Sequence, residues 1–275
     1  MEKLNSGKVY KRVLTIAGSD SGGGAGIQAD IKTISACGCY AMTAITAITI
    51  QNTVGVNGVY PIPENIIEAQ INAVLSDIGA DAVKIGMLNT SEVILAVKRT
   101  LQRYQIKNIV LDPVIVSTSG HQLLQDEAIE TLKKELLYNV RLITPNIPEA
   151  EIILGRKIGN KIEMPLFAIE LSAGRKVSVF LKAGHLKGNE LTDIFYNAET
   201  DEILELKSER IDTQNTHGTG CTLSSALASY LAKGLSLNEA VLHAKEYLNS
   251  AIIAGADYQT GKGHGPIHHF YKFWK

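Results

Sequence analysis

Short runs of apolar residues alternate along most of the chain with longer segments whose apolar residues recur at helical spacing. In residues 25–36, for example, Ile27, Ile31 and Ile34 are four and three residues apart, which places them on one face of a helix. The pattern predicts helices at residues 25–36, 64–78, 91–104, 126–137, 148–154, 164–174, 220–232 and 238–254. It predicts strands at residues 12–18, 42–50, 82–85, 108–111, 140–144 and 177–181, and a hairpin at 193–206.

The predicted strands are almost entirely apolar, as strands buried on both faces usually are. Helices between such strands form right-handed crossovers, which give a mostly parallel sheet. The polar segment 155–163 is too short to separate two domains, so we interpret it as a loop. The sequence therefore predicts an α/β fold, a three-layer α/β/α sandwich with a mostly parallel central sheet, in one domain spanning residues 1–275. Ligands in such folds bind beyond the carboxyl ends of the strands.

The composition excludes several classes of protein. Hydrophobic residues make up 45% of the chain and charged residues 20%, which is typical of a globular protein and not of a disordered one. The net charge of −1 gives no attraction to nucleic acid or to an anionic membrane, so we expect neither partner. The apolar segment 41–50 is too short to cross a bilayer, and the N-terminus has no apolar leader. We expect a cytoplasmic protein.

The cysteines are too few for a disulfide framework, since the chain has three. Cys37 and Cys39 are separated by one residue, a spacing that the common zinc knuckles do not use. We therefore interpret this pair as small buried side chains and not as metal ligands. His264, His268 and His269 lie near the end of the chain, where a polar terminal tail is favoured over a metal site.

A glycine-rich segment, residues 17–26, follows the first predicted strand and precedes a helix. Its glycines allow a ligand to approach the backbone and leave the amides of the helix N-terminus open. The segment contains neither a dinucleotide-binding fingerprint nor a P-loop, because the glycine and lysine spacings of those motifs are absent. An anion-binding loop and a tight turn that needs positive φ both remain open.

A second glycine-rich segment, residues 212–222, leads into the helix predicted at 220–232. Gly218, Thr219 and Gly220 present several unpaired amides at a helix N-terminus, where the helix dipole adds positive charge. This arrangement favours a phosphoryl group that develops negative charge, and the alternative is an ordinary capped, buried helix. Cys221 lies in the first turn, where a thiolate is favoured, so we expect a lowered pKa. A base, a nucleophile and a small space-filling side chain remain open for it.

Two carboxylates follow neighbouring predicted strands. Asp112 ends the strand at 108–111, and Glu149 lies three residues after Asn146, beyond the strand at 140–144. Carboxylates at neighbouring strand ends can hold Mg²⁺ through water, as is usual near phosphates. Taken singly, Asp112 is better explained as a turn cap before proline and Glu149 as a helix N-terminal charge. Together with two glycine-rich loops, they favour a magnesium site.

These motifs occur in a fixed order along the chain. They are residues 17–20 (Ala-Gly-Ser-Asp), 51–54 (Gln-Asn-Thr-Val), 84–88 (Lys-Ile-Gly-Met-Leu), 112–114 (Asp-Pro-Val), 144–149 (Thr-Pro-Asn-Ile-Pro-Glu) and 216–222 (Thr-His-Gly-Thr-Gly-Cys-Thr). Together they resemble the ribokinase-like superfamily and, within it, the hydroxymethylpyrimidine/phosphomethylpyrimidine kinases of thiamine biosynthesis. The resemblance covers essentially the whole chain. It implies a ribokinase-like fold, a homodimer, and phosphorylation of 4-amino-5-hydroxymethyl-2-methylpyrimidine and then of its monophosphate, with ATP as co-substrate and Mg²⁺ as cofactor.

The resemblance also implies roles for individual residues. The residues that match the anion hole and the catalytic base are Gly218, Thr219, Gly220 and Cys221. Those that match substrate-pyrimidine contacts and pocket walls are Gln51, Asp30, Gly18, Met87 and Val114. Those on the nucleotide side are Asn146, Lys182, Lys245 and Thr216, and the metal is implied at Asp112 and Glu149.

Two other functions compete with this one. A pyridoxal/pyridoxine kinase of the same superfamily can carry the same Gly-Cys loop, but Gln51 favours the pyrimidine, because its amide donates and accepts hydrogen bonds at once. A non-catalytic nucleotide-binding regulator on a kinase scaffold would not need to keep Asn146, Glu149 and Cys221 together.

Overall fold

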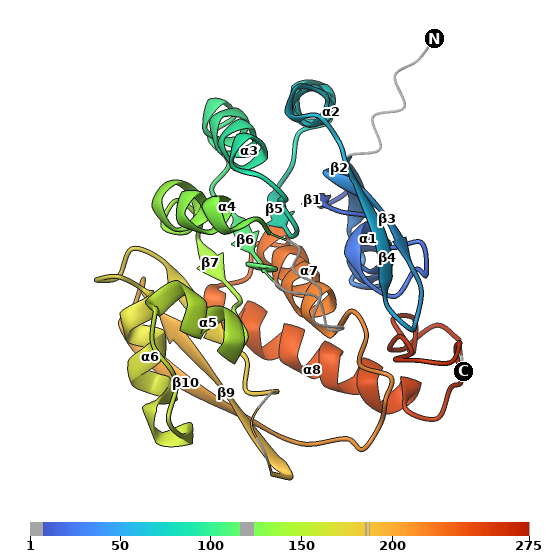
Figure 1. The fold of residues 1–275 in the computed structure, drawn as a ribbon, viewed down its shortest axis with the longest axis vertical. Coiled ribbons are helices and arrows are strands. Elements are labelled where there is room, and N and C mark those ends of the chain that lie inside the picture. The colour runs from blue at the N-terminus through green and yellow to red at the C-terminus, as the bar shows by residue number, and fades with distance from the viewer. Residues whose placement is uncertain (1–7, 116–123, 185, 187, 275) are drawn as a thin grey trace.

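The core of the fold is a central sheet. In the computed structural model, which describes residues 8–115, 124–184, 186 and 188–274, eight strands form this sheet in the order β10-β9-β8-β7-β6-β5-β1-β2 (Figure 1). The strands are β1 (Arg12–Ala17), β2 (Tyr40–Ile45), β5 (Ala82–Ile85), β6 (Ile109–Leu111), β7 (Leu142–Ile143), β8 (Ser178–Leu181), β9 (Glu190–Asn197) and β10 (Glu202–Glu209). Strands β2, β1, β5, β6, β7 and β8 run parallel, and β9 and β10 form an antiparallel hairpin at one edge. The mostly parallel sheet and the hairpin are both confirmed.

Helices cover both faces of the sheet (Figure 1). One face packs against α1 (Gly26–Ala36), α7 (Thr219–Ala232) and α8 (Leu237–Gly255). The other packs against α2 (Glu64–Asp77), α3 (Ser91–Arg103), α4 (Asp126–Thr131), a π-helical turn (Leu132–Leu136), α5 (Ile147–Leu154) and α6 (Met164–Leu171). Successive strand residues point to opposite faces. Thus Val13 enters one hydrophobic cluster and Leu14 the other, and the predicted three-layer sandwich is confirmed.

The strand predicted at 42–50 is divided into two. Strand β2 ends at Ile45, and β3 (Ala47–Gln51) leaves the central sheet to pair with β4 (Val56–Pro61) in a separate two-stranded sheet. The strand changes partner at Thr46. Its N–H donates to the Ala17 carbonyl of β1 at 3.0 Å, the last bond of the ladder between β1 and β2, whereas its carbonyl accepts from the Ile62 N–H just after β4 at 3.0 Å and its hydroxyl donates to the Met87 carbonyl at 2.7 Å. Threonines recur at residues 43, 46 and 49, so the sequence does not mark Thr46 as the point of the break.

The predicted loop at 155–163 contains a short 3₁₀ turn (Lys161–Glu163). The C-terminal residues after α8 return to the carboxyl edge of the sheet, where the Gly265 carbonyl accepts a hydrogen bond from the His217 N–H at 3.0 Å. The expectation of a polar terminal tail is wrong for His268 and His269, which are buried. His269 Nε2 lies 3.1 Å from the Thr222 hydroxyl, so this segment packs against α7. Within the described residues, no helix has the length and apolarity that a membrane crossing requires.

Candidate active site

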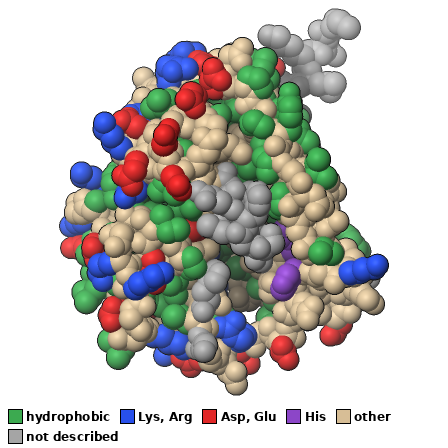
Figure 2. All heavy atoms as spheres, in the orientation of Figure 1, with side chains coloured by type: hydrophobic (Ala, Val, Ile, Leu, Met, Phe, Trp, Pro, Cys, Tyr) green, Lys and Arg blue, Asp and Glu red, His purple; other side chains and the backbone are tan. Residues whose placement is uncertain are grey.

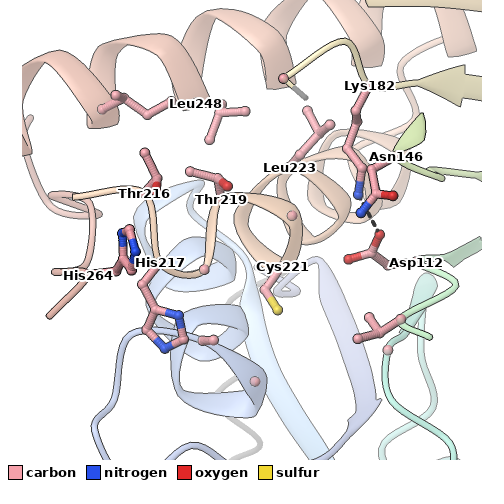
Figure 3. A pocket seen from close by; sticks show the side chains of 18 of the residues that line it. Asp112, Asn146, Lys182, Thr216, His217, Thr219, Cys221, Leu223, Leu248 and His264 are labelled. Atoms are coloured by element: carbon pink, nitrogen blue, oxygen red, sulfur yellow. Dashed lines mark hydrogen bonds and ion pairs between the residues drawn. The ribbon is translucent and has the colours of Figure 1, made fainter. Parts of the chain in front are cut away.

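One large cleft, of about 680 Å³, opens at the carboxyl ends of the parallel strands. The face shown in Figure 2 is hollowed beside histidine side chains, and Figure 3 shows the cleft from close by. The predicted site residues that line it are Gly18, Gln51, Met87, Asp112, Val114, Asn146, Glu149, Lys182, Thr216, Gly218, Thr219, Gly220, Cys221 and Lys245. Asp30 does not line the cleft. The fold therefore brings together residues that are spread over most of the sequence.

The first glycine-rich loop is organised by Asp20, which sequence reasoning did not single out as a site residue. Its carboxylate is 1% exposed and accepts hydrogen bonds from the N–H groups of Gly22, Gly24 and Ala25 at 2.9, 3.0 and 2.8 Å. Burial alone would raise the pKa of Asp20, but the hydrogen bonds from His217 and from these amides hold the pKa below its usual value. Because the amides already bind Asp20, they are not free for an anion. The tight-turn interpretation of this loop is the one that the structure supports.

The second glycine-rich loop has the opposite character. Gly218 precedes α7 with φ of +82°, and a Cβ there would overlap the carbonyl of Gly24, so the position requires glycine. Within the described part of the chain, the backbone N–H groups of Gly218, Gly220 and Cys221 find no hydrogen-bond acceptor. Free amides at a helix N-terminus form an anion-binding site. We call these three amides the amide nest.

Cys221 lies in the first turn of α7, with its sulfur facing the cleft (Figure 3). Burial raises the pKa of its thiol to about 11, although the nearby Lys84 ammonium lowers it in part. The carboxylates of Asp30 and Asp112 raise the pKa further. The expectation of a lowered pKa is therefore wrong, because burial and two acidic neighbours outweigh the helix N-terminus.

Asp30 lies beneath the cleft and is completely buried. Both of its oxygens accept hydrogen bonds from Lys84 Nζ at 2.9 Å, and the hydroxyls of Thr15 and Ser225 donate to it at 2.6 and 2.8 Å. These partners come from β1, β5 and α7, so the carboxylate joins α7 to the sheet below Cys221. Lys84, not Asp30, reaches the lining of the cleft. A lysine within the apolar strand at 82–85 was the signal for it.

Asp112, Lys182 and Glu149 form a second charged cluster (Figure 3 shows the first two). Lys182 Nζ lies 2.9 Å from Asp112 Oδ1 and 4.0 Å from Glu149 Oε2. The Thr144 hydroxyl also donates to Asp112 Oδ1 at 2.9 Å. Burial would lower the pKa of Lys182, but the two carboxylates raise it more, so the ammonium stays charged. Burial raises the pKa of Glu149, and Lys182 opposes the rise only partly.

Asn146 and Glu149 also cap α5. The Glu149 N–H donates to Asn146 Oδ1 at 2.9 Å, and the Asn146 N–H donates to Glu149 Oε2 at 2.8 Å. The helix-cap interpretation of Glu149 is therefore correct, and the same side chain also lines the cleft. Lys245 of α8 also lines the cleft and pairs with Asp193 of β9, with Nζ 2.7 Å from Oδ2. No motif in the sequence indicates a role for Asp193.

At the opposite side of the cleft, Gln51 ends strand β3 and lies next to His217. His217 Nε2 is 2.8 Å from Asp20 Oδ2 and 3.3 Å from the Gln51 amide nitrogen. His217 lies between Thr216 and Gly218 in the sequence, but sequence reasoning assigned it no role. What marks His217 as a site residue is its contact with Asp20, and this contact cannot be seen in the sequence because the two residues are 197 positions apart.

Comparison with known proteins places this geometry in a family. A family model described as phosphomethylpyrimidine kinase matches residues 20–268. The chain belongs to the phosphomethylpyrimidine kinase family. The hydroxymethylpyrimidine/phosphomethylpyrimidine kinase of Rhizobium meliloti is 49% identical over 263 residues, which cover 95% of this chain and 98% of the relative. The predicted family and enzyme class are therefore confirmed, and this enzyme is a kinase.

Solved structures agree with the fold. A crystal structure of phosphomethylpyrimidine kinase from Clostridium difficile is 46% identical in sequence and superposes with a TM-score of 0.77. The aligned region covers 88% of this chain and 99% of the Clostridium difficile chain. Pyridoxal kinase from Bacillus subtilis, solved as an ADP complex, is 38% identical in sequence and superposes with a TM-score of 0.84. The aligned region covers 95% of this chain and 98% of the Bacillus subtilis chain. The ribokinase-like fold is confirmed.

Proposed function

We propose that this kinase transfers the terminal phosphoryl group of ATP to the hydroxymethyl oxygen of 4-amino-5-hydroxymethyl-2-methylpyrimidine. It then phosphorylates the monophosphate, which gives the diphosphate used to build thiamine. The observation that carries the proposal is the position of Cys221 and the amide nest between two different ends of one cleft. Gln51 lies at one end, and the Asp112–Lys182 ion pair lies at the other.

We assign the end with Gln51 to the pyrimidine. The Gln51 amide offers a donor and an acceptor, which match the ring nitrogen and the amino group of an aminopyrimidine. We assign Gly18, Met87 and Val114, which also line the cleft, to the walls around the pyrimidine. Asp30 contributes indirectly in this scheme, because it holds Lys84 at the floor of the cleft.

We assign the other end to ATP. Lys182, which directly follows β8, and Lys245 of α8 supply positive charge, and Asn146 and Thr216 supply polar groups. The free N–H groups of Gly218 and Gly220 point to the place where the transferred phosphoryl group gains negative charge. Thr219 keeps the turn closed, because its N–H donates to the Thr216 carbonyl at 3.3 Å.

Mg²⁺ is proposed at Asp112 and Glu149, held largely through water and phosphate oxygens. In the described part of the chain, no cluster of three or more His, Cys, Asp or Glu side chains could hold a metal by itself. Asp112 Oδ2 accepts no hydrogen bond from a described residue and faces Gly220 of the amide nest. A free carboxylate oxygen beside a phosphate site suits a magnesium ion that keeps most of its waters. The bound ion would neutralise phosphate charge.

The first transfer forms a bond between the hydroxymethyl oxygen and the terminal phosphorus as the bond to the ADP oxygen breaks. The hydroxymethyl proton passes to the Cys221 thiolate, which faces the cleft beside the amide nest. The phosphate oxygen of the second substrate is already ionised near neutral pH, so the second transfer needs no base to form the nucleophile.

Three wider properties complete the proposal. The continuous sheet supports one kinase domain over residues 1–275. Exposed apolar side chains on β3 and β4, among them Ile48, Ile50 and Tyr60, are compatible with a homodimer. Light scattering tests that state. The three unpaired cysteines support a reducing compartment such as the cytoplasm.

Pyridoxal phosphorylation is the second candidate, favoured by the likeness to the Bacillus subtilis pyridoxal kinase. The deciding experiment incubates the enzyme and ATP with the hydroxymethylpyrimidine, its monophosphate, pyridoxal and pyridoxine, and identifies products by mass. The proposal expects the pyrimidine mono- and diphosphates as main products. Pyridoxal phosphate as the main product would establish the second candidate. ATP binding with no phosphorylated product would indicate a regulator.

A further inference from the structure

His217 is held rigidly beside the pyrimidine end of the cleft. Its backbone N–H donates to the Gly265 carbonyl at 3.0 Å, and its ring nitrogen Nε2 lies 2.8 Å from Asp20 Oδ2. The loop amides of Gly22, Gly24 and Ala25 hold that carboxylate in place. No step of the proposed chemistry uses this histidine, although it lines the cleft.

The contact with Asp20 determines where His217 carries a proton. A carboxylate oxygen at 2.8 Å must face an N–H group, because two lone pairs at that distance repel each other. Asp20 is ionised, since its pKa lies below the usual value. Nε2 of His217 is therefore protonated in both the neutral and the charged form of the ring.

The Gln51 amide lies between two groups whose hydrogens are already determined. Its nitrogen is 3.3 Å from His217 Nε2, which would set two N–H donors against each other. Its oxygen is 3.4 Å from the Thr49 hydroxyl, whose only hydrogen points to the Ser19 carbonyl at 2.8 Å. When the amide is rotated by 180°, its NH₂ group can donate to the Thr49 hydroxyl oxygen, and its oxygen replaces the opposed donor and shares the Nε2 hydrogen of His217 with Asp20. The two ends of an amide are distinguished only by their hydrogen-bond partners.

We propose that His217 is a positioning residue that fixes the direction of the Gln51 amide, with the oxygen toward His217 and the NH₂ group toward Thr49. This inference rests on the proposed function of the site. The second lone pair and the second N–H of the amide then face the cleft in one fixed order. An aminopyrimidine edge has a donor, the amino group, beside an acceptor, the ring nitrogen. A 4-oxo analogue has the reverse order, so the fixed amide accepts the amino form and rejects the oxo form.

The test compares kcat/KM for the amino substrate with kcat/KM for its 4-oxo analogue. In the parent, the ratio strongly favours the amino form. His217→Phe keeps a ring but removes the donor, so Gln51 can turn, and the ratio should fall by about fivefold or more, the value of one hydrogen bond. His217→Gln restores an N–H and should recover part of the ratio. His243→Ala, a surface histidine on α8, is the control and should leave the ratio unchanged.

A double-mutant cycle separates positioning from general damage. In the Gln51→Ala background, His217→Phe should no longer change the ratio, because the group that it positions is gone. An undiminished effect of His217→Phe in that background, or an unchanged ratio in the single variant, would overturn the proposal. NMR of the substrate-free parent gives a reading that does not depend on activity. It should show a protonated His217 Nε2 and a Gln51 NH₂ close to the Thr49 methyl group. Close contact of the NH₂ with the His217 ring would also refute it, whereas lack of turnover by the parent refutes only the proposed function.

Discussion

Replacing Cys221 with serine should separate the two phosphorylation steps. The first acceptor is an alcohol, which must lose a proton during transfer, and the second is a phosphate monoester that is already ionised. Cys221 is the titratable side chain of the amide nest, and it lines the cleft. Serine preserves the approximate size of the side chain and the backbone amides but supplies no group that ionises readily. Cys221→Ser should therefore slow the first step by roughly 10²-fold or more, the usual contribution of a general base.

The raised pKa of Cys221 adds a second signature. With a pKa of about 11, only about one thiol in 10⁴ is ionised at pH 7. As long as the pH is below that pKa, each increase of one pH unit makes the reactive thiolate about ten times more abundant. The rate of the first step in the parent should therefore rise steeply from neutral to alkaline pH. The second step should stay nearly constant once the phosphate monoester is fully ionised, above about pH 6.

Single-turnover quenched-flow measurements with each acceptor, at a series of pH values, decide the matter. The expected result is a first step that loses both its rate and its pH dependence in Cys221→Ser, while the second step falls much less. Equal losses on the two acceptors would mean that Cys221 shapes the amide nest and moves no proton. An unchanged rate with both acceptors would return Cys221 to a space-filling role.

Further predictions concern the metal, the nest and the buried ion pair. Glu149→Gln should raise the Mg²⁺ concentration for half-maximal rate by roughly tenfold or more. Burial raises the pKa of Glu149, so its negative charge is lost as the pH falls. The parent should therefore need more Mg²⁺ at mildly acidic pH, whereas the Mg²⁺ requirement of the variant should not change with pH. Identical Mg²⁺ titrations of parent and variant would mean that Glu149 is a helix cap and not a metal ligand. Gly220→Ala places a Cβ 3.3 Å from Asp112 Oδ2 and crowds the metal site, so kcat should fall roughly tenfold. The same change should stabilise the helix by about 0.5–1 kcal/mol in urea unfolding. An unchanged kcat would show that the Cβ does not crowd the site. Lys84→Met leaves Asp30 buried without its cation and should lower the free energy of unfolding by about 3–5 kcal/mol. The double variant Lys84→Met with Asp30→Leu should recover most of that loss. A single variant as stable as the parent would show that the ion pair is dispensable.

The layered fold could be predicted because a buried parallel strand and an amphipathic helix leave different patterns in the sequence. Strand β6, for example, is buried at all three positions, and its apolar run ends at Asp112, directly after the strand. The separate sheet of β3 and β4 could not be predicted, because Thr43, Thr46 and Thr49 look alike in the sequence, and only the contacts of Thr46 with Ala17 and Met87 show that β2 ends there. Those partners are remote in sequence, so the local pattern carries no trace of them.

The site was predictable where a residue type at a strand end or helix start carries its own chemistry. Asp112 and Cys221 belong to this group. Asp20 and His217 were missed, because each depends on a partner that the chain supplies from far away, whereas Lys84 was missed although a lysine within an apolar strand is a local signal. His217 is paired with Asp20 at a separation of 197 residues. Neither sequence neighbourhood contains the other partner, and only the packed loops bring the two side chains into contact.

The two glycine-rich loops differ in a way that the sequence does contain. Residues 17–26 include Asp20, and its carboxylate takes up three amides that an anion would need. The acidic residue of segment 212–222 is Asp212, which is exposed and accepts no hydrogen bond from the described amides of the loop, and the amides of Gly218, Gly220 and Cys221 stay free. An internal carboxylate both occupies the donors and repels a second negative charge. A glycine-rich turn before a helix can therefore bind phosphate only where no carboxylate of the turn takes up its amides, and this criterion supports our proposal that the second loop is the phosphate site and that the first loop supports it.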